Sequence, residues 1–164
     1  MVGGIILLCI AFIMILFYNQ VNRAKMKMDG SGLIVDNLLN ERFDCLNELA
    51  QIVNEQGGDG KAMMAKAEEL WKTCRVKPNK NRYHESMNEA QASLTAAIDT
   101  MAIKDSEAVR QLYDKLRDID ARLQKAKQNY NKFVKLYNEQ IVAFPTSVFA
   151  KAMNAKERKP FDQA

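Results

Sequence analysis

The sequence predicts an all-α protein in which an N-terminal transmembrane helix continues into an elongated antiparallel four-helix bundle. Residues 2–18 carry no charged side chain. The rest of the chain is poor in proline, with only Pro78, Pro145 and Pro160, and no stretch alternates β-branched and polar residues between turns. Its apolar residues instead recur at alternating spacings of three and four. Together these patterns favour helices throughout.

The apolar N-terminal run predicts a membrane anchor over residues 1–22. No charge appears before Arg23, so the run crosses about 30 Å of hydrocarbon as a helix. A cleaved signal peptide is disfavoured, because no Lys or Arg precedes the run and no small-residue cleavage site follows it. Arg23, Lys25 and Lys27 come next, and such cations stay inside. We expect a single-pass protein with a short N-terminus outside and the bundle in the cytoplasm.

Helix-breaking segments divide the bundle, residues 23–145. Glycines at 57–60 and Pro145 end helices, and glycines at 29–32 are expected to kink the first one or to form a flexible turn. Cys45 and Cys74 both fall in helices and need no disulfide, although a bridge between them stays open. The predicted helices cover about 19–56, 61–74, 82–103 and 106–144.

The last predicted helix carries an apolar seam with the heptad spacing of a coiled coil. Similar seams in the other helices predict left-handed antiparallel packing, so the last helix returns toward the membrane. The seam residues are Val109, Leu112, Leu116, Ile119, Leu123, Ala126, Tyr130, Phe133 and Tyr137.

The pair Tyr-Asn occurs three times, at Tyr18-Asn19, Tyr130-Asn131 and Tyr137-Asn138, with Phe144-Pro145 following the last pair. Tyr130 and Tyr137 are seven apart because both lie on the seam, and each asparagine lies beside its tyrosine. The returning helix should bring Tyr137 to the level of residues 26–30. We therefore expect the three pairs to come together.

Residues 146–164 predict a short helix and a basic tail near the membrane. Thr146 or Ser147 is expected to cap this helix. Apolar side chains would enter the bilayer interface and cations would meet anionic headgroups. The alternative, in which Val148 and Phe149 close the end of the bundle and the tail is disordered, stays open. The expected membrane-surface residues are Phe149, Lys151, Lys156, Arg158 and Lys159.

Residues 118–161 resemble the C-terminal signature of the LemA family: a basic helical run, two Tyr-Asn pairs, Phe-Pro and a terminal Pro-Phe. Residues 18–20, and residues 38–53 through Arg42, Asp44, Leu46, Asn47 and Leu49, are similar to upstream family segments. The family's Tyr-Pro before the last helix is absent here. The resemblance implies one N-terminal span, an elongated helical bundle, no established enzymatic activity and, for some members, a link to magnetosome formation.

Residues with catalytic or metal-binding chemistry are few. His84 is the only histidine, so it completes no zinc or haem pair, and we expect it on the surface or at a loop end. Residues 57–61 lack the spacing of a phosphate-binding loop, and no nucleophile has an evident base. We expect no enzyme, no cofactor, no metal site and no small-molecule substrate. The net charge of +4 is spread among acids, which disfavours nucleic acid.

Arg42 has two interpretations. It forms a partly buried pair with Asp118 or Asp120, or it lies on a solvated face while Asp118 pairs with Arg122 along the same helix. We favour the solvated face. Lys66 and Lys127 are expected on the surface as well.

These patterns favour a non-enzymatic, membrane-anchored, LemA-like scaffold with a role in membrane or organelle organisation. Its expected partners are the lipid bilayer and a protein or a second copy of the chain. The alternative is a sensory or signalling bundle coupled to the anchor. Candidate structural and interaction residues are Tyr18, Asn19, Arg42, Asp44, Asn47, Tyr130, Asn131, Tyr137, Asn138, Phe144 and Pro145.

Overall fold

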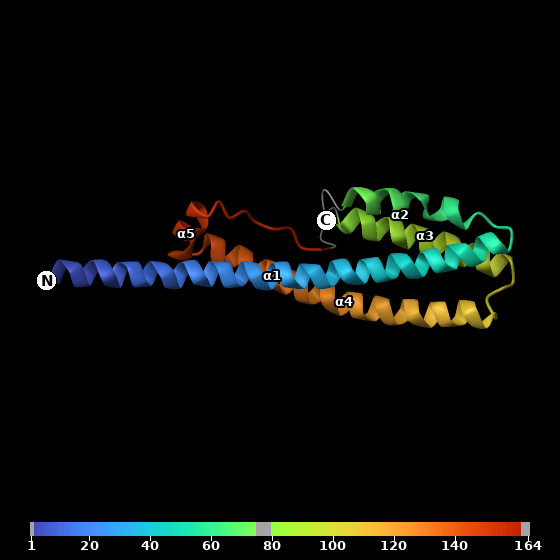
Figure 1. The fold of residues 1–164 in the computed structure, drawn as a ribbon, viewed down its shortest axis with the longest axis horizontal. Helices are drawn as coiled ribbons and strands as arrows, with labels where there is room; N and C mark the ends of the chain where they lie inside the picture. Colours follow the sequence, from blue (N-terminus) through green and yellow to red (C-terminus); the bar gives the residue numbers. More distant parts are fainter. Residues whose placement is uncertain (1, 75–79, 162–164) are drawn as a thin grey trace. The chain divides into compact units, whose positions relative to one another are not determined.

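The computed structural model describes residues 2–74 and 80–161, and for residues 2–4, 6, 7, 10 and 74 it describes the backbone alone. Over these residues the chain forms five helices and no strand, which confirms the predicted all-α class. In chain order the helices are α1 (Val2–Glu55), α2 (Gly60–Cys74), α3 (Lys80–Thr100), α4 (Glu107–Val142) and α5 (Thr146–Ala152) (Figure 1).

The predicted anchor, residues 1–22, falls partly on residues outside the described side chains. Among the residues that the structure does describe, no helix has the length and apolar character needed to cross a membrane.

Helix α1 is continuous where a kink or turn was expected at residues 29–32. The Ser31 hydroxyl donates to the Met28 carbonyl at 2.8 Å, one turn back, and so adds a bond within the helix. The helix ends just before Gly57. The φ angle of Gly57 is +85°, a conformation that glycine adopts with little strain because it has no Cβ. Gly60 then starts α2 so close to α1 that an added Cβ would clash with the Ala50 carbonyl oxygen. These glycines permit the tight reversal.

The chain divides into two compact units. The central unit is Val35–Lys125, and the terminal unit combines Met1–Ile34 with Ala126–Ala164. The sequence instead suggested a division at about residues 22 and 145. The difference arises because the segment after α4 folds back along that helix, and the last residues thereby join the early part of α1 in one unit.

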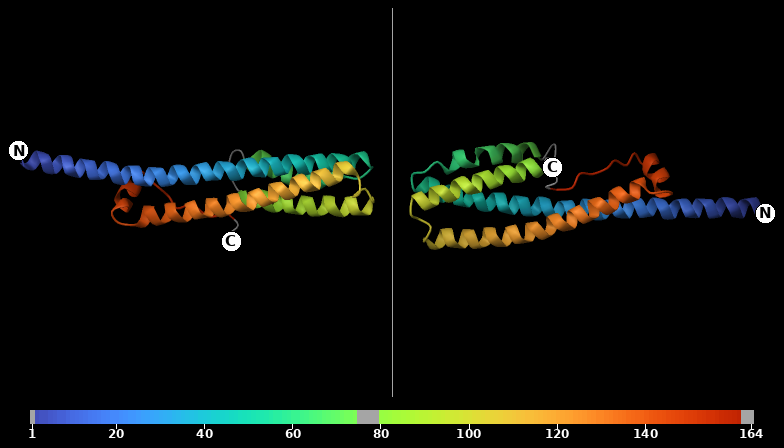
Figure 2. Two further views of the ribbon diagram at one scale, coloured as in Figure 1. Left: turned by 90° about the horizontal axis from the view of Figure 1, so that it is seen from below. Right: turned by 180° about the vertical axis from the view of Figure 1, so that it is seen from behind.

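The central unit packs α2 and α3 with the later part of α1 and the early part of α4, and chain direction alternates from one helix to the next (Figures 1 and 2). The predicted seam residues of α4 in this unit are all buried. Phe43 adds an aromatic stack, with its ring centroid 5.5 Å from that of Trp71 and 6.0 Å from that of Tyr83. The most buried apolar residues include Leu39, Leu46, Leu49, Met87, Leu94, Ile98, Leu116, Ile119 and Leu123.

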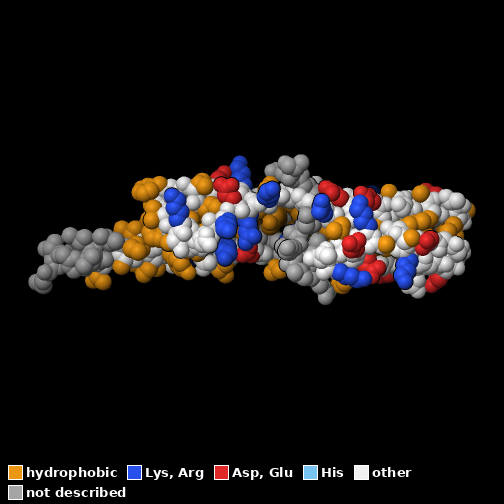
Figure 3. Space-filling view, turned by 90° about the horizontal axis from the view of Figure 1, so that it is seen from above, with side chains coloured by type: hydrophobic (Ala, Val, Ile, Leu, Met, Phe, Trp, Pro, Cys, Tyr) orange, Lys and Arg blue, Asp and Glu red, His pale blue; other side chains and the backbone are white. Residues whose placement is uncertain are grey.

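The terminal unit packs the early part of α1 against the later part of α4 and against α5. Its core joins Val21 and Met28 of α1 with Val134, Tyr137 and Ile141 of α4, and Ala150 of α5 completes it. Tyr137 therefore lies at the level of residues 26–30, as the sequence predicted. Around this core, many apolar side chains of the unit reach the surface (Figure 3).

The start of α5 corrects one expectation. Pro145 occupies the position before the helix, and no side chain there caps the first turn. Thr146 is buried, and its hydroxyl donates to the carbonyls of Gln140 at 2.5 Å and Ala143 at 2.9 Å. Thr146 thus binds one carbonyl in the last turn of α4 and one just after that helix, where the Ala143 carbonyl also accepts from the Ser147 amide, and it does not cap the amides at the start of α5.

Candidate functional site

Two asparagines of α4 hold the C-terminal segment by its backbone. The Asn131 side chain donates to the Phe161 carbonyl at 2.9 Å and accepts from the Phe161 amide at 2.6 Å. Asn138 does the same with Arg158, at 2.8 Å and 2.9 Å. Each amide group thereby pairs with one residue as a neighbouring β-strand would. We call Asn131 and Asn138 the asparagine clamp.

The spacing of the clamp fits the geometry of the two segments it joins. Seven residues of helix rise about 10.5 Å, and three residues of extended chain span about 10 Å. Residues 155–160 have no helical structure, so Arg158 and Phe161 can follow Asn138 and Asn131 at the same interval. The sequence analysis missed this contact. Its available signal was the seven-residue repeat of asparagine on a helix that is followed by a proline-containing tail.

Phe161 anchors the end of the clamped segment. Its side chain is only 2% exposed, and Lys127 places its ammonium nitrogen 4.7 Å from the ring centroid. At this distance the cation is attracted to the face of the ring. Lys127 itself is buried, so its expected surface position was wrong. The buried ring and the clamp act together on residues 158–161.

The other predicted residues of the Tyr-Asn repeats lie in different surroundings. Tyr130 is half-buried against the core of the terminal unit, whereas Tyr18 is 49% exposed. Asn19 lies with Phe133 along a surface groove of that unit. All three pairs belong to the terminal unit. Within it, Tyr130 and Tyr137 of α4 pack on the core, whereas Asn131 and Asn138 bind the tail.

Burial changes how the Tyr137 hydroxyl titrates. Loss of hydration raises the pKa of Tyr137, and the nearby carboxylate of Asp29 raises it further, while Arg158 lowers it. The phenol therefore stays neutral at physiological pH and adds no charge to the core beside α1.

The predicted membrane-surface residues occupy α5 and the tail. Lys151, Lys156, Arg158 and Lys159 have exposed side chains, and so does Phe144 before them, at 86%. Pro145 is partly buried. Phe149 is half-buried because it stacks on Phe17, with ring centroids 5.9 Å apart.

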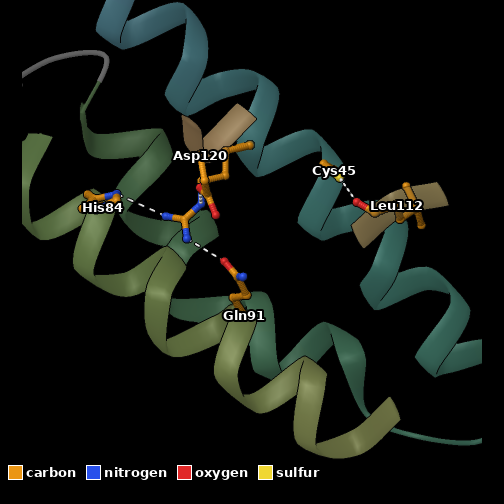
Figure 4. Close-up of polar contacts among 6 residues, drawn as sticks. Cys45, His84, Gln91, Leu112 and Asp120 are labelled. Atoms are coloured by element: carbon orange, nitrogen blue, oxygen red, sulfur yellow. Dashed lines mark hydrogen bonds and ion pairs between the residues drawn. The ribbon is translucent and has the colours of Figure 1, made fainter. Parts of the chain in front are cut away.

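Arg42 is the centre of a polar cluster in the central unit, drawn in Figure 4. One terminal nitrogen lies 3.1 Å from His84 Nδ1 and the other donates to Gln91 Oε1 at 2.6 Å. Its Nε lies 2.9 Å from Asp120 Oδ1, although the direction of the N–H is too bent for a hydrogen bond. One side chain of α1 thus joins α3 and α4. We call these four residues the arginine hub.

The hub corrects the preferred interpretation of Arg42 as a solvated residue, because its side chain is 4% exposed. Asp118 pairs with Arg122 at 2.9 Å, as expected, but this pair does not replace the pair of Arg42 with Asp120. Burial lowers the pKa of Arg42, and the Asp120 carboxylate opposes that shift. The guanidinium keeps its charge because arginine is too basic to lose its proton near neutral pH.

His84 is also placed differently from the expectation. It is half-buried within α3 instead of lying at a loop end. A guanidinium can only donate, so Nδ1 of His84 accepts in this contact. Asp44 and Asn47 of α1 are exposed.

Cys45 is a free, buried thiol. It donates to the Leu112 carbonyl at 3.5 Å (Figure 4), and burial raises its pKa to about 11. The side chain of Cys74, its suggested disulfide partner, lies outside the described residues. Within the described residues, no three His, Cys, Asp or Glu side chains gather as a metal site.

The helices, the hub and the clamp define an all-helical protein in which the described polar side chains join helix to helix and helix to tail. The chain belongs to the LemA family, whose model matches residues 33–164. No curated protein and no solved structure matches it.

Proposed function

We propose that this LemA family protein is a non-enzymatic scaffold, held to a membrane by residues 2–18 as a single-pass anchor. In this proposal the four-helix arrangement of the central unit lies in the cytoplasm and binds a protein partner or a second copy of the chain. The supporting observation is the distribution of exposed apolar side chains between the two units.

Every large apolar side chain that is strongly exposed among the described residues belongs to the terminal unit. Soluble proteins rarely expose contiguous apolar surface of this kind. A lipid bilayer would cover the part nearest the N-terminus. The exposed residues are Ile5, Leu8, Phe12, Ile13, Met14, Ile15, Leu16, Tyr18, Met26, Leu33, Ile34, Leu136, Val142, Phe144 and Val148.

The exposed residues after α4 support a second membrane contact. Phe144 and Val148 are 86% and 57% exposed, and cations follow at Lys151 and Lys156. Phe144 and Val148 would enter the interface, while Phe149 stays on Phe17. In this proposal α5 lies on the same membrane that residues 2–18 cross.

A scaffold role also fits the use of charged side chains in the central unit. Arg42 binds residues of two other helices, and Glu41 and Glu48 of α1 pair with Arg122 and Lys115 of α4. These groups hold helices in register. The proposal therefore assigns function to the outer faces of the helices.

Membrane extraction with alkaline carbonate tests the anchor. Replacing Leu8 and Phe12 by Arg should release the protein, because each Arg costs about 3 kcal/mol in the middle of a span. The matched control replaces Leu33 and Ile34 by Arg. These side chains are also strongly exposed but lie beyond the apolar run, so this variant should stay bound to the membrane. Release of the native chain, or of both variants alike, contradicts the anchor.

Orientation is tested with reporters at the two ends of the chain. A reporter at Met1 should be accessible from outside intact cells, and one at Ala164 should not, because the cations after the run stay inside. Labelling of Ala164 in intact cells contradicts the cytoplasmic placement.

A further inference from the structure

A groove of about 340 Å³ opens on the surface of the terminal unit. Leu16, Arg23 and Lys27 of α1 line one wall, and Phe133, Leu136 and Gln140 of α4 line the other. Its volume lies within the range of small-ligand sites. The groove starts within the apolar N-terminal run, at Leu16, and extends past the end of that run to Lys27.

The chemistry of the walls changes along the groove. Leu16 and Leu136 are 52% and 42% exposed, so they present apolar surface. Arg23 and Lys27 are both exposed, and no carboxylate is among the described residues that line the groove. The groove thus combines apolar contact with two cations. A ligand that matches it has an anionic group next to a hydrocarbon chain.

Gln140 adds a requirement for a hydrogen-bond donor. Its Oε1 is buried and accepts no hydrogen bond from any described residue. A buried acceptor of this kind costs about 1–3 kcal/mol unless it is paired. Gln140 lines the groove, so a ligand hydroxyl there would supply the donor once the side chain turns its oxygen toward the groove.

We infer that this groove binds the headgroup of one anionic phospholipid, of the phosphatidylglycerol type. Its phosphate lies between Arg23 and Lys27, a hydroxyl of its glycerol headgroup donates to Gln140, and the first methylenes of an acyl chain contact Leu16 and Leu136. The inference rests on the proposed anchor, because a span over residues 2–18 places Arg23 and Lys27 at headgroup level.

Native mass spectrometry of the full chain in detergent tests the site. Dioleoyl phosphatidylglycerol and dioleoyl phosphatidylcholine are added at equal concentrations, and inorganic phosphate is titrated separately. The test variant carries Arg23→Gln and Lys27→Gln. Its matched control carries Lys25→Gln and Lys132→Gln, which remove the same charge from exposed positions that do not line the groove.

The expected result is one phosphatidylglycerol per chain, retained in preference to phosphatidylcholine. Loss of two cation contacts should weaken retention about 30-fold, whereas the control should stay within about threefold of the native chain. Leu136→Glu should also weaken retention, because its carboxylate repels the phosphate. Both test positions are exposed, so their replacement leaves the core intact.

Equal retention of the two lipids, equal losses in both double variants, or inorganic phosphate bound as tightly as the lipid would each overturn the inference. Its failure is distinguishable from failure of the anchor. A chain that stays in the membrane fraction and retains both lipids equally has an anchor and no such site. A chain that leaves the membrane fraction yet prefers phosphatidylglycerol in detergent has the site and no such anchor.

Discussion

The two units differ in how much of their apolar surface is buried. In the central unit, Leu46 and Leu94 are fully buried, and the described part of the unit has no large apolar side chain that is strongly exposed. In the terminal unit, the core is small and long stretches of α1 keep their apolar side chains outside. The comparison teaches that the heptad seam explains the burial of apolar surface in the first unit, whereas in the second unit it supplies only part of the core, through Tyr137. The second unit has apolar surface that its own helices do not cover.

The units also differ in how polar side chains are used. Arg42 joins regular helices through side-chain contacts in the central unit. Asn131 and Asn138 bind the backbone of a non-helical segment in the terminal unit. An arginine reaches several partners from one position, whereas an amide pairs with a single peptide unit by donating and accepting at once. Each residue type therefore suits the segment that it holds.

The largest expected effect on stability comes from replacing a buried leucine of the central unit, compared with an exposed leucine of the terminal unit. Leu94→Ala should lower the free energy of unfolding by about 3 kcal/mol, because it opens a cavity in a filled core. The matched control, Leu33→Ala, should change it by less than about 0.5 kcal/mol, because Leu33 is 64% exposed. Urea unfolding of the full chain in detergent, followed by circular dichroism, measures both. Equal effects would remove the distinction between the units.

The second effect concerns the arginine hub. Arg42→Met keeps most of the side-chain volume but loses the contacts with α3 and α4, and should cost about 1–2 kcal/mol. The expected loss of stability is limited because the Asp120 side chain is 41% exposed and can be hydrated when Arg42 is replaced. Arg110→Met is the control, since Arg110 pairs with Asp105 and both side chains are exposed, and it should cost less than about 0.5 kcal/mol. A melting temperature of Arg42→Met at or above that of the native chain would show that the hub does not stabilise the unit.

The third effect concerns the clamp. Asn131→Asp keeps the shape of the side chain and can still accept from the Phe161 amide, but it cannot donate to the Phe161 carbonyl. Losing about 1 kcal/mol should speed hydrogen exchange of the Phe161 amide about fivefold. The control is Asn129→Asp on the exposed side of α4. If exchange rises equally in both variants, charge alone explains the change and the clamp is not required.

The last effect, which appears only at alkaline pH, is a pH dependence in the central unit. The pKa of Cys45 rises from 9.0 to about 11 on folding, so the folded state holds the thiol proton more tightly than the unfolded chain. This contribution is complete below pH 9 and is lost as the pH rises through 11. Between pH 9 and pH 11, the melting temperature of the native protein should therefore fall further than that of Cys45→Ala. Cys9→Ala should follow the native curve, and parallel curves for all three would contradict the assignment.

Much of the fold could be predicted because it depends on local patterns. The apolar spacing from Val109 to Leu123 predicted which face of α4 is buried, and the glycines at 57–60 predicted the end of α1. The continuity of α1 through Gly30 could not be predicted from propensity, since glycine in an exposed helix costs only about 1 kcal/mol and packing elsewhere offsets it. Met28 and Ser31, on either side of Gly30, are buried, so packing beside the glycine supports the helix there.

The hub and the clamp were harder to predict because each depends on an arrangement between segments. Whether Arg42 faces water or Asp120 depends on the rotation of α1 against α4, and a shift of one position along the helix turns a side chain by about 100°. The clamp depends on the conformation of residues 155–160, which carry no periodic pattern. Sequence reasoning identified Asn131 and Asn138 as notable residues, but it did not identify what they bind.

Asn131 and Asn138 are as far apart along α4 as the two tail residues that they bind. The clamp therefore requires a fixed number of residues between those two points of the tail. Because each amide pairs with one particular residue, both pairs form only when two residues separate Arg158 from Phe161. One added or deleted residue there would leave one asparagine satisfied and the other facing a peptide group out of phase. The tail can therefore vary freely in its outward side chains, but its length between these two points is fixed by the pitch of α4.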